Sequence, residues 1–169
     1  MRISERKTRD GQPPTWFEVC GEDGRFVKAD AKIEGIQVQQ MLLGGQEVII
    51  GAVTDGSFGK LVAFGLGGVL VEVLKDITFR LAPATRDDAL SMLDGIQAHE
   101  MLKGVRGSDP ANRDAIADII VNVSRLITDF PEISEMDLNP VFATKANAIA
   151  ADVRIVVDFA PPAPRPRPN

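Results

Sequence analysis

Residues 47–64 read EVIIGAVTDGSFGKLVAF and have the pattern of two antiparallel strands joined by a turn. β-Branched residues dominate Glu47 to Val53, which is typical of a strand. Thr54-Asp55-Gly56 contains residue types that favour a turn, and Lys60 to Phe64 then returns as a second apolar segment. The stretch therefore predicts a hairpin, which is a unit of an antiparallel sheet.

Further strands are expected on both sides of this hairpin. They cover residues 36–41, 69–74, 77–81, 136–142 and 148–157. A capping box at Thr85-Arg86-Asp87-Asp88 predicts the start of a helix, and residues 96–102 predict a second, short one. Asp109-Pro110 is a good N-cap and first-turn pair for a long helix that Pro131 ends. This order predicts an α+β fold, in which an antiparallel sheet has its helices on one face.

Composition limits the possible functions. The chain has 169 residues, 44% of them hydrophobic and 25% charged, which suits one globular domain. With 19 basic and 24 acidic residues, the net charge of −5 gives no support to a nucleic-acid partner. The longest apolar run, residues 64–74, contains glycines and Glu72, so we expect no membrane span. The first ten residues lack the apolar core of a secretory signal, which favours the cytoplasm.

Three zones differ along the chain. Residues 1–30 form a polar, weakly patterned N-terminal segment, and residues 31–158 form the predicted folded domain. Residues 159–169 are a tail with five prolines. Because proline has no backbone N–H and resists both helices and central strands, we expect this tail to be extended and dispensable for folding.

The last predicted hairpin contains the sharpest candidate site. If its turn, Thr144-Lys145-Ala146-Asn147, is symmetric, Asn139 faces Asp152 and Asp137 faces Arg154. Residues two apart on a strand share a face, so Asp137, Asn139 and Asp152 converge on one side of the hairpin. Opposed Cβ atoms lie about 5 Å apart, and a few hard oxygen ligands with room for water and phosphate suit Mg²⁺. An exposed polar surface explains the same spacing and, from spacing alone, is the commoner case.

Other polar residues in apolar surroundings have two interpretations each. Glu47 and Glu72 lie in predicted apolar strands, where a buried carboxylate needs a cation, a hydrogen-bond donor or water as its partner. The alternative to a binding role is an edge strand whose polar face is exposed to solvent. The glycines of residues 65–68 would let backbone amides approach a phosphate, but no Walker lysine follows and a tight turn is the simpler explanation. His99, the only histidine, is expected to be structural.

A set of ordered motifs carries a resemblance to a known family. The motifs are KIEGIQVQQM at 32–41, EVIIG at 47–51, FGLGGVLVEVLKD at 64–76, RLAP at 80–83, GVRG at 104–107 and EMDLNP at 135–140. With them, residues 31–157 resemble the ATP-grasp domain of the NDP-forming acyl-CoA synthetases, including the ADP-forming acetate–CoA ligases. A more distant resemblance is to the β subunit of succinyl-CoA synthetase.

This resemblance implies an ATP-grasp-like half domain with ATP or ADP and Mg²⁺ as cofactors. The family converts acyl-CoA, ADP and phosphate into free acid, CoA and ATP through a phosphohistidine. By position, Asn139 and Asp152 resemble the Mg²⁺ ligands, with Asp137 in support. The residues implied on the adenine and ribose sides of the nucleotide are Gln39, Gln40, Met41 and Glu47.

The departures from the family define the expected partners. The family's phosphohistidine belongs to a CoA-ligase domain, and His99 does not fall at that motif. The family's phosphate-gripping lysine lies in a preceding half domain that this sequence does not match. We therefore expect a nucleotide- and Mg²⁺-binding part that a CoA-binding or CoA-ligase subunit or domain completes. The alternative is a non-catalytic interaction module that recruits a partner or self-associates.

Overall fold

The computed structural model describes residues 2–4, 18–20, 42, 44–67, 76–104 and 109–158. The chain divides into two compact units, Met1–Gln40 and Met41–Asn169. In the first unit, strands β1 (Arg2–Ser4) and β2 (Glu18–Cys20) pair antiparallel. The predicted strands at 36–41 and 69–74, the predicted site residues Gln39, Gln40 and Met41, and Glu72 lie outside the described residues.

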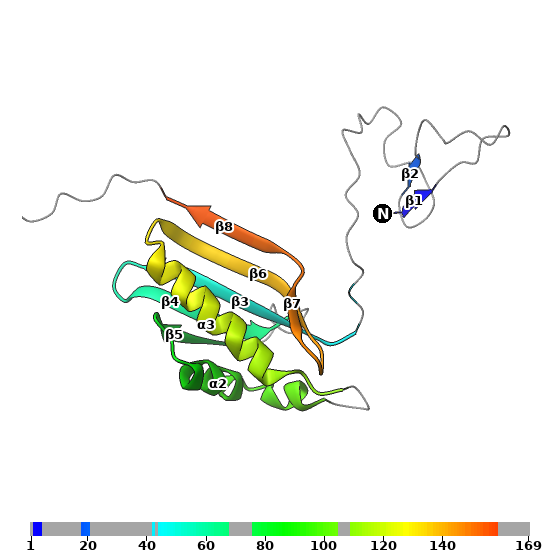
Figure 1. Cartoon of the computed structure of the whole chain (residues 1–169), viewed down its shortest axis with the longest axis horizontal. Helices are drawn as coiled ribbons and strands as arrows, with labels where there is room; N and C mark the ends of the chain where they lie inside the picture. Colours follow the sequence, from blue (N-terminus) through cyan, green and yellow to red (C-terminus); the bar gives the residue numbers. More distant parts are fainter. Residues whose placement is uncertain are drawn as a thin grey trace, which may run out of the picture. The chain divides into compact units, whose positions relative to one another are not determined.

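The second unit has the predicted α+β architecture. Its elements are β3 (Gln46–Asp55), β4 (Gly59–Leu66), β5 (Ile77–Leu81), α2 (Arg86–Gly95), the 3₁₀-helix η1 (His99–Lys103), α3 (Arg113–Asp129), β6 (Ile133–Ala143), β7 (Ala148–Ala150) and β8 (Val153–Val157). The strands form one antiparallel sheet in the order β5-β4-β3-β6, and β6 pairs on its other side with both β7 and β8. Helices α2 and α3 lie across one face of this sheet (Figure 1).

The hydrophobic core lies between the helices and the sheet. Alternate residues of β3 point into it, and Val48 and Ile50 are fully buried. From the other side, α3 contributes a stripe at helical spacing that includes Ile116, Ile120 and Ile127. Because each such side chain stabilises the fold by roughly 1.5–3 kcal/mol when it is removed from water, this layer supplies much of the stability. The opposite face of the sheet carries no helix among the described residues, and we call it the open face.

Helix starts agree with the sequence at one helix and differ at the other. Thr85 caps α2 and forms a complete capping box with Asp88, as predicted. The prediction that Asp109-Pro110 starts α3 is wrong, because Asn112 is the N-cap. The Asn112 side chain accepts a hydrogen bond from the Ala115 amide at 3.0 Å, and the Asn112 amide donates to the Thr144 carbonyl at 2.8 Å. A contact with the β6–β7 turn thus fixes the start of α3.

Two further predictions need correction. Residues 96–102 were expected to form a short helix, and the structure has the 3₁₀-helix η1 slightly later, from His99. Residues 148–157 were expected to form one strand, and they form two, because the chain leaves the ladder at Ala151 and Asp152. This interruption lies beside a predicted metal ligand.

Candidate functional site

The register of the last hairpin is the predicted one. Strand β6 pairs with β7 up to the Val141–Ala150 pair and with β8 from the Leu138–Val153 pair onward. Asp137 lies directly opposite Arg154, as expected. Asn139 and Asp152 lie in the gap between these two ladders. On the β7 side of the gap, the Ala151 amide donates a hydrogen bond to the Pro140 carbonyl at 2.9 Å.

Asn139 lies on the open face, at a β-bulge of β6. Between the Val48–Val141 and Ile50–Leu138 pairs, Asn139 and Pro140 together face the single residue Ile49. An extra residue of this kind bends a strand and redirects its side chains. As a result Leu138 and Val141 are both buried under the helices, whereas Asn139 is exposed on the opposite side.

The oxygen atoms of these side chains are largely available. Among the residues that the structure describes, Asp137 and Asn139 have no side-chain hydrogen-bond partner. Asp152 is exposed, and its Oδ1 accepts a hydrogen bond from the amide of the next residue, Val153, at 2.9 Å. In the described part of the chain, no three His, Cys, Asp or Glu residues are grouped to hold a metal. The candidate donors are the carboxylates of Asp137 and Asp152 and the amide oxygen of Asn139, and hard oxygens of this kind are the ligands that Mg²⁺ prefers.

Glu47 lies on the same open face at the start of β3. It is half-buried and pairs across the sheet with Phe142. Its carbonyl accepts a hydrogen bond from the Gly67 amide at 2.7 Å. A Cβ atom on Gly67 would lie 2.9 Å from the Glu47 Cβ, closer than side chains pack. Gly67 is therefore the residue that lets the end of β4 pass against Glu47.

The sequence alone did not identify Gly67 as the residue that packs against Glu47. The glycines of residues 65–68 predicted a turn or a phosphate loop, and Gly68 lies outside the described residues. The signal was the glycine itself at the end of an apolar strand, since such a glycine marks a close approach of two backbones. Its partner, Glu47, became evident only from the fold.

Arg154 adds a positive charge beside the carboxylates. Its guanidinium donates to Glu135 Oε1 at 3.2 Å, and both side chains are exposed. An exposed pair of this kind contributes about 0–1 kcal/mol to stability, so it has little structural value. Its effect is electrostatic, because Arg154 partly offsets the negative charge of Glu135 and of Asp137 opposite.

His99 has local partners and takes no part in this site. Its Nδ1 lies 3.1 Å from the Ile96 carbonyl oxygen, and its Nε2 lies 3.1 Å from Glu100 Oε1. Both of these partners are hydrogen-bond acceptors within η1 or next to it, so the contacts of the ring are local.

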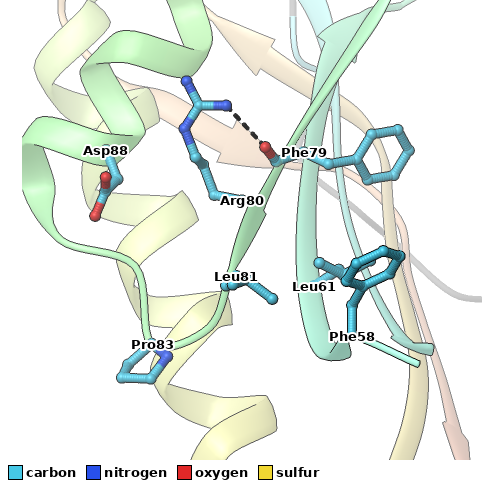
Figure 2. A pocket seen from close by; sticks show the side chains of 7 residues that line it. All are labelled: Phe58, Leu61, Phe79, Arg80, Leu81, Pro83 and Asp88. Carbon is cyan, nitrogen blue, oxygen red and sulfur yellow. Dashed lines mark hydrogen bonds between the residues drawn. The ribbon is translucent and has the colours of Figure 1, made fainter. Parts of the chain in front are cut away.

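A separate pocket of about 510 Å³ lies at the other end of the sheet (Figure 2). Its lining residues are Phe58, Leu61, Phe79, Arg80, Leu81, Pro83 and Asp88. Leu61 pairs with Val53, six residues along β3 from Glu47, and a strand rises by about 3.3 Å per residue, so roughly 20 Å separates the pocket from Glu47. The pocket is not part of the Asn139–Asp152 site.

Comparison with known proteins defines the class. The sequence model of the ATP-grasp domain matches residues 22–157, and the chain belongs to this family. It is similar to the β subunit of acetate–CoA ligase [ADP-forming] I from Pyrococcus furiosus, with 47% identity over 141 residues. That match covers 83% of this chain and 61% of the relative, so the chain spans about three fifths of the relative's length.

Solved structures agree with this assignment. The dinucleotide-forming acetyl-coenzyme A synthetase 1 of Ca. Korarchaeum cryptofilum, in complex with coenzyme A, Ca-AMPCP and HgCl⁺, has a TM-score of 0.71 and 44% identity, over 76% of this chain and 56% of that one. A selenomethionine form of the same enzyme binds coenzyme A and Mg-AMPPCP, with its phosphohistidine segment pointing towards the nucleotide binding site; its TM-score is 0.66, at 42% identity, over 69% and 55% of the two chains. None of the helices in the described part of our chain has the length and apolar character of a membrane span.

Proposed function

We propose that this chain is the nucleotide- and Mg²⁺-binding part of an ADP-forming acyl-CoA synthetase. The reaction is the conversion of acyl-CoA, ADP and phosphate into free acid, CoA and ATP. The observation that carries the proposal is the position of Asn139, which lies on the open face at the β6 bulge and beside the gap that holds Asp152. The family membership and the similarity to an ADP-forming ligase subunit support the same reaction.

Each residue of the site has a proposed task. Asn139 and Asp152 would hold Mg²⁺, and Asp137, two residues before Asn139 on β6, would support them. Glu47 accepts a hydrogen bond from a ribose hydroxyl, and Gln39, Gln40 and Met41 lie beside adenine. Mg²⁺ held by these residues would offset the negative charge of the transferring phosphoryl group. The sheet contributes pre-organisation, because Glu47 pairs with Phe142 and because β3 and β6 pair on both sides of the bulge that holds Asn139.

The remaining groups come from other domains or subunits. A CoA-binding or CoA-ligase subunit or domain supplies the phosphohistidine, and the preceding half of the ATP-grasp domain supplies the phosphate-binding lysine. This proposal is supported by one relative, which is the β subunit of an ADP-forming acetate–CoA ligase, and by a similar enzyme whose structure contains coenzyme A. Alone, the chain binds nucleotide weakly and turns nothing over. The need for ATP and acyl-CoA, with a single cysteine in the sequence, supports the cytoplasm as its compartment.

Calorimetric titration tests the metal assignment. Mg·ADP is titrated into the wild type and into Asn139→Ala and Asp152→Ala, and we expect each variant to lose at least tenfold in affinity, since each removes one ligand. Asn122→Ala and Asp129→Ala are matched controls, because both residues are exposed on α3, on the other side of the sheet. Equal heats for the wild type and the site variants would remove Asn139 and Asp152 as ligands. Turnover by the purified chain alone would contradict its incompleteness.

One observation favours the second candidate function, a non-catalytic interaction module. Large apolar side chains are exposed on the open face and at both sheet edges, including Phe79 and Leu81 on β5 and Ile155 on β8. Contiguous exposed apolar surface usually marks a contact with another protein. Light scattering discriminates the two: a stable oligomer that binds no Mg·ADP supports the module, and a monomer that binds it supports the enzyme part.

A further inference from the structure

The pocket at the β5 edge combines exposed aromatic and aliphatic surface with charge. Phe58 is 71% exposed, Leu81 58% and Phe79 51%, which is unusual for side chains of this size. Figure 2 shows the Phe79 ring on one side of β5 and the Arg80 and Asp88 side chains on the other, towards α2. A ligand in this pocket would therefore meet apolar surface and a charged rim together.

Hydrogen bonds decide which charge of the rim is available. Arg80 donates to its neighbour's carbonyl, that of Phe79, at 2.8 Å and to Ser91 Oγ at 3.0 Å, so its N–H groups are directed at the protein. Both acceptors are neutral, so the positive charge of Arg80 remains and offsets part of the negative charge of Asp88. Asp88 uses only Oδ2 in the capping box, accepting from the Thr85 amide and hydroxyl at 2.9 and 2.6 Å. Its Oδ1 remains available, and the carboxylate of Asp55, which holds the Phe58 amide at 2.9 Å, adds a second negative charge nearby.

We propose that the proline-rich segment 159–169 of the same chain folds back across the sheet and binds in this pocket. Prolines in an extended polyproline conformation lose little entropy on binding, and grooves lined by aromatic side chains recognise them. The segment contains five prolines, together with Arg165 and Arg167 and no acidic residue. Its prolines match the apolar wall of Phe58, Phe79 and Leu81, and its arginines match the excess negative charge that Asp88 and Asp55 keep over Arg80.

The path is short enough for the segment to follow. One cross-strand row connects Val156 of β8, through Glu135, Val53 and Leu61, to Leu81 of β5. Neighbouring strands lie about 4.8 Å apart, so the four steps of this row cover about 19 Å. The chain leaves β8 at the same end of the sheet as the pocket.

The segment has the reach that this path requires. Arg165 lies seven residues after Asp158. A polyproline helix rises by about 3.1 Å per residue, which places Arg165 up to about 22 Å from the end of β8. Overall charge favours the encounter as well, because the segment has two basic residues and the rest of the chain has 17 basic against 24 acidic residues.

Nuclear Overhauser spectroscopy on the full-length chain tests the proposal. Samples carry ¹³C-labelled Phe and Leu, and we expect cross-peaks from the Phe58 and Phe79 rings to proline protons of residues 161–168. Phe58→Ala should remove them, and it should not disturb folding because Phe58 is largely exposed. Ile149→Ala, an exposed position on β7 at the other end of the sheet, should leave them unchanged.

Two further measurements complete the test. The double variant Arg165→Glu/Arg167→Glu should reduce the bound population about fivefold, the effect of one exposed ion pair. Mixing labelled with unlabelled protein separates contacts within one chain from contacts between two. Overturning results are the absence of the proline cross-peaks, pocket resonances that the double variant leaves unchanged, or cross-peaks that arise only between different molecules.

Discussion

Gly67 connects the packing of the sheet to the candidate nucleotide site. Its amide holds the Glu47 carbonyl, and its missing side chain leaves the space that the Glu47 Cβ occupies. Gly67→Ala should therefore displace the first residues of β3 and weaken Mg·ADP binding severalfold, with loss of stability. The matched control is Gly56→Ala, since an added Cβ there meets nothing within 4 Å. Calorimetry and thermal melts measure both effects, and an unchanged affinity in Gly67→Ala would separate Gly67 from the site.

Ser124 is a second residue whose role depends on one bond. Its hydroxyl is fully buried on α3 and accepts a hydrogen bond from the Ala84 amide at 2.6 Å. Ser124→Ala leaves that amide without an acceptor in the core, which costs about 1–3 kcal/mol of unfolding free energy. Ser57→Ala in the exposed β3–β4 turn should change stability by less than about 0.5 kcal/mol. Denaturant unfolding of both variants checks the difference, and equal midpoints would contradict it.

At the scale of one element, α2 depends on its first turn. Hydrogen bonds from the Thr85 side chain and amide hold the pKa of Asp88 below its ordinary value, so the ionised carboxylate stabilises the folded state. This contribution is present above the ordinary carboxyl pKa of 3.8 and is lost as the pH falls through the lower folded value. Asp88→Asn should therefore destabilise the protein at pH 7 and much less at pH 2.5.

Thermal melts of the wild type and Asp88→Asn at both pH values measure this difference. The other half of the capping box gives an independent check, because Thr85→Ala should cost about 1 kcal/mol at pH 7. A gap between wild type and Asp88→Asn that stays the same from pH 7 to pH 2.5 would show that the carboxylate charge has no part in the cap.

The sequence predicts those elements whose ends are determined by residues next to them in the chain. The α2 capping box, the β3–β4 turn and the end of α3 before Pro131 depend on neighbouring residues, and all were predictable. The start of α3 at Asn112 was not, because a contact with the distant Thr144 carbonyl determines it.

The candidate site divides in the same way. The spacing around a symmetric turn predicted that Asp137 faces Arg154. It did not predict the bulge at Asn139 and Pro140 or the break at Asp152, because a bulge arises from pairing with β3, which turn symmetry does not describe. The closeness of Gly67 and Glu47 likewise depends on two strands whose approach the sequence alone does not reveal.

At the scale of the whole molecule, the edges of the sheet determine how the chain meets other chains. Strand β8 is an edge strand, and Val153, Ile155 and Val157 are exposed along one side of it. Apolar edge strands pair with other chains unless a charge interrupts them. Ile155→Lys should therefore lower concentration-dependent self-association without loss of folding, as light scattering and circular dichroism would show. Asn122→Lys on α3 is a control for the added lysine, because Asn122 is neutral and exposed, and self-association that persists in Ile155→Lys would exclude this edge.

The gap between β7 and β8 gives the two proposed metal ligands unequal mechanical support. Asn139 belongs to a strand with neighbours on both flanks, whereas Asp152 belongs to a short break at the periphery. Fluctuations that open a sheet start at its margins, at a free-energy cost well below that of global unfolding. Asp152 would detach first and release the ion while Asn139 stays in place. The lifetime of the bound cation would then measure how often the edge of the sheet at the β7–β8 break opens locally.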